Sequence, residues 1–535
     1  MKAAEAIIQC LIKENIKTVF GYPGATVVAL YEALRESEIE HILVRHEQAA
    51  GHSASGFARS TGTTGVCIVT SGPGATNIIT SVATAYMDSI PMVIITGQVK
   101  SNLIGKDVFQ EADITGAVES FTKHNYLVKS AEDIPRIIKE AFYIAGTGRP
   151  GPVLIDIPSD IQEQNIDFEY PEEVNIRGYK PTVIGHKGQI KRALDKIKSS
   201  KKPLICTGGG IGCAKAEKEL MEFVKKSKIP IVHTLMGKDC VQGDNPYYVG
   251  LIGSHGFSYA NKAVSEADVL ILIGTRIADR ATAGSKYFGK DAEIIHIDID
   301  PAEIGKNLGT NIPVVGDCKN ILEELIKGIE PFNTDQWIDE IRSWQKEVKM
   351  QCWEDKVDPK CCLKILSETI EDDAIITADV GQNQIWCARN FTVKGERRFL
   401  TSGGLGTMGY SLPAAVGAKM AQPNRRVVAV MGDGSFQMSL FELGTAAQNN
   451  VNLIIILFNN SGLGMVREIQ NRIYEGNYGV ALNCNPDFIK IAEAYGFTGK
   501  RVNSNEAFEK ALKEAMESTK TFIIECEVDP RESTF

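Results

Sequence analysis

Short runs of β-branched and other apolar residues recur along the chain, and each run is closed by Gly, Pro or Asp and followed by a segment with helical periodicity. The clearest runs begin at Val66, Met92, Val153, Leu204, Val269, Ile294, Ala374, Val427 and Leu453. Continuous apolar strands that alternate with helices predict parallel sheets covered on both faces. We therefore expect an α/β protein in which a doubly wound parallel sheet occurs about three times.

Two polar stretches predict where three domains separate. Residues 159–185 hold Pro171 and Pro181 and lack periodicity, and residues 331–360 are charged. The first stretch is typical of a linker, and the second of a connecting helix followed by a linker. We expect domains at residues 1–165, 185–335 and 360–535. A length of 535 residues agrees with this division, because it predicts roughly two to four domains.

Composition and charge argue against several classes of protein. Hydrophobic residues make up 43% of the chain and charged residues 23%, which is ordinary for a folded globular protein. The net charge of −9 argues against a nucleic-acid partner. The longest apolar runs have the length of strands, and the twelve cysteines contain no C-x-x-C pair. We therefore expect a cytoplasmic protein without a membrane span, in which the cysteines are buried thiols.

Two neighbouring strands are predicted to end in groups that can bind a metal and a phosphate. Gly432, Asp433, Gly434 and Ser435 follow the strand VVAVM, and Asn459 and Asn460 follow the strand LIIILF. Open α/β sheets bind ligands at the carboxyl ends of their strands. Glycines let a diphosphate approach the backbone, and carboxylate and amide oxygens suit Mg²⁺. Taken singly, each motif could be a tight turn or a helix cap, but together they favour a metal–diphosphate site.

A second candidate is Glu47 in the segment Arg45-His46-Glu47-Gln48-Ala49-Ala50. It follows the apolar run HILV and precedes small residues, so we expect a buried carboxylate at the end of a strand, with a ligand or a raised pKa. The alternative is a surface glutamate that caps a helix. A zinc-protease motif is excluded, because H-E-x-x-H would need a histidine where Ala50 stands.

With these residues in hand, the chain resembles thiamine diphosphate-dependent enzymes, and within them the large subunits of the acetohydroxyacid synthase (acetolactate synthase) family. G-D-G…N-N matches the cofactor-anchoring signature of that family, and R-H-E-Q-A-A matches its catalytic glutamate segment. Other matching strings are VFGYPGA from Val19, TSGPGATN from Thr70, ATAYMDSIP from Ala83, FQEADITG from Phe109, TKHNYLV from Thr122, GRPGPVLIDIP from Gly148, TLMG from Thr234, HIDIDPAEIGKN from His296, SGGLGTMGYSLPAA from Ser402 and GMVRE from Gly464.

The resemblance implies thiamine diphosphate and Mg²⁺ as cofactors. It implies Asp433, Asn460 and the main-chain carbonyl of Gly462 as metal ligands, and Glu47 as the proton partner of the pyrimidine nitrogen. It also implies that Met408 lies beneath the thiazolium ring, and it places Asn383 where the family usually has a histidine. The cofactor contacts implied in addition are Gly24, Pro73, Asn77, Gln382, Asn383, Gly406, Gly432, Gly434, Ser435, Leu463, Gly464 and Met465.

The implied reaction is decarboxylation of pyruvate and its ligation to a second 2-keto acid, giving 2-acetolactate or 2-aceto-2-hydroxybutyrate in branched-chain amino-acid biosynthesis. Phe109 and Gln110 are implied to line the substrate pocket, and Arg276 to pair with the acceptor carboxylate. Read alone, Arg276 could equally be a surface arginine after a buried strand. Glu468 and Ile469 stand where the family has Gln and Trp, so the acceptor preference does not carry over.

The resemblance also implies FAD, without net redox work, in the middle domain. As a dinucleotide fingerprint the loop at Gly208 is weak, because Cys213 replaces its last glycine. The subunits are implied to form at least a homodimer, or a homotetramer, with each active site between the first domain of one subunit and the third of another. A small regulatory subunit is a further possible partner. The FAD contacts implied are Gly208, Gly209, Thr234, Leu235, Arg276, Arg280, Asp298 and Asp317.

Two other functions stay open at this point. One is another thiamine diphosphate-dependent 2-keto acid decarboxylase, C–C hydrolase or carboligase with a different acceptor. A pyruvate decarboxylase is disfavoured, because the sequence contains no His-His pair. The other is a nucleotide-binding regulatory or dehydrogenase-like protein built on the Gly208 loop. It is disfavoured because it leaves Glu47, G-D-G and N-N without a role.

Overall fold

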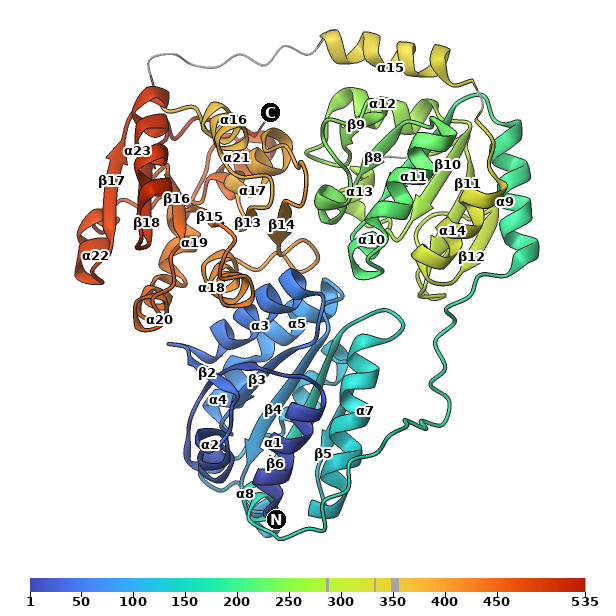
Figure 1. Cartoon of the computed structure of the whole chain (residues 1–535). Helices are drawn as coiled ribbons and strands as arrows, with labels where there is room; N and C mark the ends of the chain where they lie inside the picture. Colours follow the sequence, from blue (N-terminus) through green and yellow to red (C-terminus); the bar gives the residue numbers. More distant parts are fainter. Residues whose placement is uncertain (285–287, 332, 348–355, 535) are drawn as a thin grey trace.

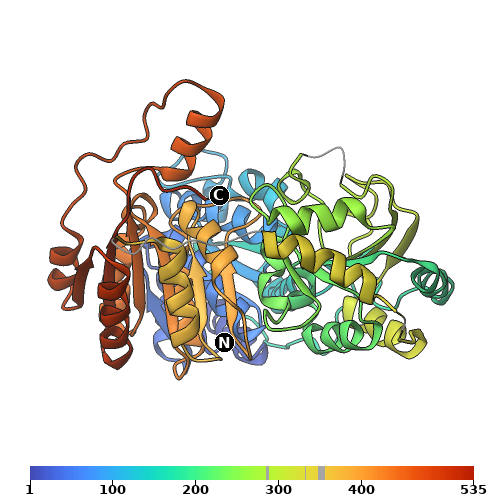
Figure 2. The ribbon, with the colours of Figure 1, turned by 90° about the horizontal axis from the view of Figure 1, so that it is seen from above.

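The computed structural model describes residues 1–284, 288–331, 333–347 and 356–534. Figure 1 shows three α/β domains, each built on its own sheet, with the first domain below the middle and third domains. Seen from above, in Figure 2, the middle and third domains lie side by side over the first. Each sheet has six strands, and their pairings are parallel. The predicted class, three doubly wound parallel sheets, is confirmed.

The first domain carries the strand order β2-β1-β3-β4-β6-β5. Along β3, Val66 and Ile68 belong to one hydrophobic core and Cys67 and Val69 to another, so both faces of the sheet are covered. The strands are β1 (Thr18–Tyr22), β2 (Glu40–Leu43), β3 (Gly65–Val69), β4 (Met92–Gln98), β5 (His124–Leu127) and β6 (Pro152–Pro158). The α-helices are α1 (Ala3–Lys13), α2 (Val28–Arg35), α3 (Glu47–Thr61), α4 (Pro73–Asn77), α5 (Ile79–Met87), α6 (Ile114–Val118), α7 (Ile134–Gly146) and α8 (Ser159–Gln162).

The middle domain carries the strand order β12-β11-β10-β7-β8-β9. Its strands are β7 (Pro203–Thr207), β8 (Ile231–His233), β9 (Tyr248–Leu251), β10 (Val269–Ile273), β11 (Glu293–Asp298) and β12 (Ile312–Val315). Its α-helices are α9 (Lys187–Ser199), α10 (Gly210–Cys213), α11 (Glu217–Ser227), α12 (Ser258–Glu266), α13 (Asp279–Thr282) and α14 (Cys318–Gly328), and α15 (Asp335–Glu347) follows them.

The third domain carries the strand order β14-β13-β15-β16-β18-β17. Its strands are β13 (Ile375–Ala378), β14 (Arg398–Thr401), β15 (Val427–Gly432), β16 (Ile454–Asn459), β17 (Thr498–Val502) and β18 (Phe522–Glu527). Its α-helices are α16 (Pro359–Thr369), α17 (Gln382–Asn390), α18 (Ser411–Ala421), α19 (Asp433–Gln437), α20 (Leu443–Gln448), α21 (Gly464–Ile473), α22 (Phe488–Ala494) and α23 (Asn505–Glu517).

The first and third domains have the same topology, and the middle domain has a different one. Counted within each domain, the first and third sheets both run 2-1-3-4-6-5, whereas the middle sheet runs 6-5-4-1-2-3. The direction in which successive strands are added to the sheet therefore reverses between β1 and β3, between β13 and β15, and between β7 and β10. Ligands of open α/β sheets bind at such reversals, beyond the carboxyl ends of the strands. The topology thus singles out three candidate binding edges.

The first and third domains are joined by close packing of α3 on α18 (Figures 1 and 2). A Cβ atom on Gly56 of α3 would lie 2.0 Å from the carbonyl oxygen of Ala414, and one on Gly417 of α18 would lie 1.9 Å from that of Ser53. The Ser53 hydroxyl donates to the carbonyl of Pro413 at 2.9 Å. These glycines therefore allow the two helices to touch backbone to backbone.

The predicted connecting segments are partly structured. Residues 159–185 begin with α8, and Asn165 forms a β-bridge with Lys2, so this part packs on the first domain. The predicted connecting helix is α15, while residues 332 and 348–355 lie outside the described residues. Among the residues that the structure describes, eight of the ten free cysteines are buried as expected, but Cys361 departs from the expectation because it is disulfide-bonded. No helix within the described ranges is long and apolar enough to cross a membrane.

Candidate active site

The carboxylate of Asp433 lies buried at the edge where the third sheet reverses. It follows β15 as the first residue of α19 and is 1% exposed. Its Oδ2 accepts a hydrogen bond from the Gly462 amide at 3.1 Å and one from Asn485 Nδ2 at 2.7 Å. Burial raises the pKa of Asp433 in spite of these donors. The site therefore holds a negative charge that neutral donors only partly compensate, which a cation would stabilise.

Asn460 lies at the end of β16, the strand that pairs with β15, and its side chain is held by Gln382. Asn460 follows β16 and is 7% exposed, and its Nδ2 donates to Gln382 Oε1 at 2.9 Å. Gln382, at the start of α17, in turn donates from Nε2 to Glu468 Oε2 at 2.9 Å and to the carbonyl of Glu532 at 2.8 Å. A Cβ atom on Gly464 would lie 1.9 Å from Gln382 Oε1, so only glycine fits beside this pair of amides.

The remaining predicted contacts of the third domain surround the same edge. The Ser435 hydroxyl accepts from the Gly432 amide at 3.2 Å, so it caps the start of α19. A Cβ atom on Gly434 would lie 2.7 Å from Leu463 Cδ2 and 3.6 Å from Met408 Cε, so both apolar side chains converge on this glycine.

The backbone beside these contacts is fixed by two buried side chains. Asn383 Nδ2 donates to the carbonyl of Asp379 at 2.6 Å. Asp379 accepts from the amides of Gly409 and Ser411, directly after Met408, at 2.9 and 2.8 Å. Burial raises the pKa of Asp379 to about 7. The turn that carries Met408 is thus tied to the end of β13.

The donor set at this edge fits Mg²⁺ and a diphosphate. It combines one carboxylate (Asp433), one amide oxygen (Asn460) and the nearby backbone of Gly462, and Mg²⁺ takes one or two carboxylates with phosphate oxygens and water. Within the described residues, no group of three or more His, Cys, Asp or Glu side chains gathers at metal distance. Arg467 Nη2 is buried without a hydrogen-bond partner among those residues, and Nη1 would lie 3.1 Å from a Cβ atom on Gly462. This orphaned cationic nitrogen suits an anion at the same edge.

Glu47 lies at the corresponding edge of the first domain, but not at the end of a strand. β2 ends at Leu43, and Glu47 is the first residue of α3, capped by His46, whose Nδ1 accepts from the Gln48 amide at 3.2 Å. The side chain is half-buried in the single chain, so the expectation of a fully buried carboxylate is wrong for one subunit. Its Oε2 accepts from Asn77 Nδ2 at 2.9 Å. The helix N-terminus and this amide both favour a carboxylate there.

Glycines and the loop at Gln110 complete this edge of the first domain. A Cβ atom on Gly74, next to Pro73, would lie 3.3 Å from Glu47 Oε1, and one on Gly24 would lie 2.5 Å from Thr70. Gly72 has φ +60° and lies against the backbone of Gln110, which itself has φ +61°. The structure therefore gathers Gly24, Glu47, Pro73, Asn77 and Gln110 at the edge formed by β1 and β3.

Phe109 is not gathered with these residues. Its side chain is 85% exposed. It does not line the cavity of about 700 Å³ that lies where the three domains meet. Neither Glu47 nor Asp433 lines that cavity either. The two catalytic edges that the sequence predicts thus lie on different domains and outside this cavity.

A carboxylate of the third domain fixes the backbone just before Glu47. Glu442 is fully buried, and its Oε1 accepts from the Arg45 amide at 2.9 Å, while Thr445 Oγ1 donates to Oε2 at 2.6 Å. Burial raises the pKa of Glu442 to about 7. The Arg45 side chain donates back to the carbonyl of Gly444 at 3.1 Å. Glu442 could not be predicted as part of this site, because it lies 397 positions from Arg45 and belongs to no motif.

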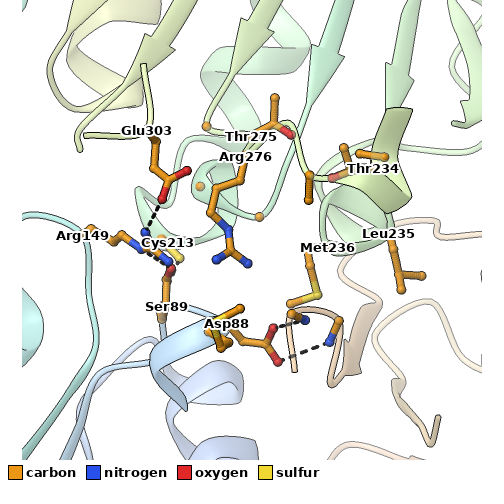
Figure 3. Close-up of a pocket in the computed structure, with 18 of the residues that line it drawn as sticks. Asp88, Ser89, Arg149, Cys213, Thr234, Leu235, Met236, Thr275, Arg276 and Glu303 are labelled. Atoms are coloured by element: carbon orange, nitrogen blue, oxygen red, sulfur yellow. Dashed lines mark hydrogen bonds and ion pairs between the residues drawn. The ribbon is translucent and has the colours of Figure 1, made fainter. Parts of the chain in front are cut away.

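A cavity of about 700 Å³ lies where the three domains meet (Figure 3). It opens at the reversal point of the middle sheet, between the loops after β7 and β10, and Arg276 extends into it. Gly208 lies just beneath its wall, where a Cβ atom would be 2.5 Å from the carbonyl of Gly274. Seven of the eight residues predicted for FAD line it: Gly209, Thr234, Leu235, Arg276, Arg280, Asp298 and Asp317. Gly406, Met465 and Ile469 of the third domain line the same cavity.

Charged side chains of the first domain hold this cavity together. Asp88 is buried and accepts from the amides of Gly403 and Gly404 at 3.3 and 2.6 Å, and burial raises its pKa (Figure 3). Arg149 pairs with Glu303 of the middle domain at 2.9 Å (Figure 3). Burial lowers the pKa of Arg276. Arg276 and Asp88 both lie beside Gly404, where a Cβ atom would be 3.0 Å from Arg276 Nη2 and 2.8 Å from Asp88 Oδ1. Sequence patterns did not single out Asp88 or Arg149 as parts of a site.

Comparison with known proteins places the chain in a family. The N-terminal TPP binding domain of thiamine pyrophosphate enzymes matches residues 1–117, their central domain matches residues 190–325, and their C-terminal TPP binding domain matches residues 379–526. The chain therefore belongs to the thiamine pyrophosphate enzyme family, as its motifs predict. Thiamine pyrophosphate is the same molecule as thiamine diphosphate.

Within this family the chain is similar to large subunits of acetolactate synthases. It is 46% identical to a probable acetolactate synthase large subunit of Methanocaldococcus jannaschii, over 100% of this chain and 93% of the relative. It is 43% identical to the isozyme 3 large subunit of Escherichia coli, over 97% and 93% of the two chains. It is 41% identical to the isozyme 2 large subunit of the same organism, over 100% and 97%.

Proposed function

We propose that this protein is the catalytic large subunit of an acetolactate synthase. It would decarboxylate pyruvate and join the remaining two-carbon unit to a second 2-keto acid, in branched-chain amino-acid biosynthesis. The observation that carries the proposal is the pairing of full-length similarity to acetolactate synthase large subunits with the Asp433 and Asn460 edge described above.

The third domain would hold the charged end of the cofactor. Asp433, Asn460 and the Gly462 carbonyl would bind Mg²⁺, and the buried charge of Asp433 and the free Nη2 of Arg467 support a metal and an anion there. Gly432, Gly434 and Gly464 would let the diphosphate approach the backbone. Thiamine diphosphate, when bound, supplies the electron sink that a decarboxylated 2-keto acid requires and that protein side chains lack.

Glu47 would share a proton with the pyrimidine nitrogen of the cofactor. The bond from Asn77 to Oε2 fixes the carboxylate, and the small Gly74 beside Oε1 leaves space in front of the other oxygen. The N-terminus of a helix favours a negative charge, and a carboxylate placed there can accept a proton from a bound group. Covering this half-buried side chain would strengthen that hydrogen bond, because the local dielectric constant falls.

A second subunit would provide that cover. Glu47 is half-buried, Phe109 is 85% exposed, and neither faces Asp433 in one cavity of this chain. A symmetric homodimer, in which the first domain of one subunit meets the third domain of the other, would complete two equivalent sites. The words "large subunit" in the names of the relatives support a small partner subunit as well.

The cavity between the three domains would bind FAD and admit the acceptor. Its volume of about 700 Å³ and its place at a sheet reversal suit a dinucleotide. Arg276 could pair with the acceptor carboxylate at the end of the cavity that Met465 and Ile469 line. Ile469 is smaller than the tryptophan that the family has at this position. The pocket wall therefore differs, and the preference between 2-ketobutyrate and pyruvate has to be measured for this chain.

The test is product analysis with purified protein. Pyruvate, thiamine diphosphate and Mg²⁺ are expected to yield 2-acetolactate, and added 2-ketobutyrate should yield 2-aceto-2-hydroxybutyrate. Free acetaldehyde as the sole product would instead identify a decarboxylase. An absorption spectrum of the same sample tests FAD, because an active but colourless protein would contradict the flavin.

A further inference from the structure

Glu468 lies behind the proposed metal site and does not touch it. It belongs to α21, and four donors converge on its two carboxylate oxygens. Gln382 Nε2 reaches Oε2 at 2.9 Å, and the Thr534 amide reaches the same oxygen at 3.2 Å. The hydroxyls of Ser533 and Thr534 reach Oε1 at 3.1 and 2.8 Å. Four donors use the full accepting capacity of a carboxylate.

This arrangement decides how the amide of Gln382 is oriented. A side-chain amide has a donating NH₂ and an accepting oxygen, and its hydrogen-bond partners determine which end points where. Nε2 of Gln382 faces two groups that can only accept, the Glu468 carboxylate and the Glu532 carbonyl. Reversing the amide would place its oxygen against both acceptors. Glu468 and the Glu532 carbonyl together therefore fix Oε1 of Gln382 on the opposite side, and Glu468 is the side chain of the two.

The orientation of Gln382 then decides the orientation of Asn460. Gln382 Oε1 only accepts, so Asn460 must present Nδ2 to it, and the two are 2.9 Å apart. Both side chains are buried, at 5% and 7% exposure, so solvent cannot substitute for either partner. Oδ1 of Asn460 is then the atom that remains for a cation, and Mg²⁺ binds oxygen and not an amide NH₂.

We propose that Glu468 is a positioning residue, which sets the oxygen of Asn460 toward the metal through the amide of Gln382. This inference rests on the proposed function, because it assumes that Asn460 is a metal ligand. The glutamine of related enzymes at this position could present either end of its amide, whereas the carboxylate of Glu468 can only accept while it is ionised. The chain therefore determines the ligand orientation with a side chain that accepts hydrogen bonds and does not donate them.

The experiment measures Mn²⁺ binding by the loss of the free-ion electron paramagnetic resonance signal, with thiamine diphosphate at saturation. Glu468→Leu removes the acceptor and is expected to weaken Mn²⁺ binding about tenfold or more, in the range of roughly 10- to 100-fold typical for the loss of a partner behind a metal ligand. Glu468→Gln keeps one accepting oxygen and should bind within about threefold of the wild-type protein. Glu509→Gln is the matched control for loss of one negative charge, because its exposed side chain pairs with Lys513 on the surface of α23.

Each outcome has one meaning. If the wild-type protein binds no Mn²⁺ with thiamine diphosphate, the proposed function fails and the inference fails with it. If the wild-type protein binds Mn²⁺ and Glu468→Leu binds it equally well, only the positioning role is overturned. If Glu468→Gln is as weak as Glu468→Leu, the negative charge acts on the metal directly, and the orientation account is wrong. A thermal melting temperature near that of the wild-type protein excludes misfolding as the cause of a loss.

Discussion

The first and third domains share one topology, yet they prepare their binding edges differently. In the third domain, Asp433, Asn460 and Gln382 are buried and joined to one another or to neighbours by hydrogen bonds within the same domain. In the first domain, Glu47 is half-buried, and the backbone before it is held by Glu442 of another domain.

The difference indicates which half of the site a single chain can form alone. The edge proposed to bind metal and diphosphate is organised within one chain. The edge proposed to transfer a proton has its carboxylate in position, but the Glu47 side chain is only half-buried. Because Glu442 follows Asp433 by nine positions, one segment of the third domain contacts both edges. If the two edges differ in this way, substitutions at Glu47, Asp433 and Glu442 should have different effects.

The largest effect is expected at Glu47. Glu47→Gln keeps the shape and the acceptor for Asn77 but cannot take up a proton, so kcat should fall by roughly 10²- to 10⁴-fold. Steady-state kinetics with pyruvate measure the loss. Metal binding, which belongs to the other edge, should stay unchanged, and Glu36→Gln on the exposed surface serves as the control. Retention of a third or more of wild-type turnover would remove Glu47 from the mechanism.

A smaller effect is expected at Asp433, where cofactor binding should weaken while the stability of the cofactor-free protein is kept or rises. Asp433→Asn should weaken Mg²⁺-dependent binding of thiamine diphosphate at least about tenfold, because the one carboxylate of the donor set is lost. The protein without cofactors should melt at the same temperature or higher, since a buried charge with a raised pKa has been removed. Fluorescence titration and calorimetry measure the two effects. Lower stability together with unchanged binding would show that Asp433 serves the fold and not the cofactor.

The smallest effect is expected at Glu442, and it depends on pH. Burial raises its pKa from an ordinary value of 4.5 to about 7, so the folded protein binds this proton more tightly than the unfolded chain does. Stability should therefore fall as pH rises through this window, by about 3 kcal/mol at most from this one group. Glu442→Gln lacks the titration. The difference in melting temperature, variant minus wild-type protein, should therefore be larger at about pH 8 than at about pH 5. Calorimetry of both proteins at these two pH values measures it. A difference that does not change with pH would show that Glu442 does not titrate there.

The sequence predicts much of this molecule because its strands are continuous apolar runs with motifs at their ends. The parallel sheets follow from that pattern, and G-D-G and N-N were expected at one edge because β15 and β16 are neighbours in the sheet. Glu47 was expected at the end of a strand, whereas β2 stops at Leu43 and His46 caps a helix before it. Local hydrophobicity could not show where the strand ends.

The supporting residues could not be predicted in the same way. Glu442 and Asn485 belong to no motif, and Glu468 ends the matching string GMVRE, which does not show what its side chain contacts. The bonds of Glu442 and Glu468 join segments that are up to 397 positions apart. Their roles depend on how α3 packs on α18 and on how residues 532–534 lie against α21. Such contacts arise from tertiary packing, which no spacing rule in the sequence records.

The most direct test of a site shared between two chains is to mix two inactive variants. Glu47→Gln lacks the edge of the first domain, and Asp433→Asn lacks the edge of the third. If each site takes one edge from each subunit, dissociating and reassociating an equal mixture should restore about a quarter of wild-type activity, because half of the dimers are mixed and each has one intact site of two. Activity no higher than the average of the two parent variants would contradict the shared site.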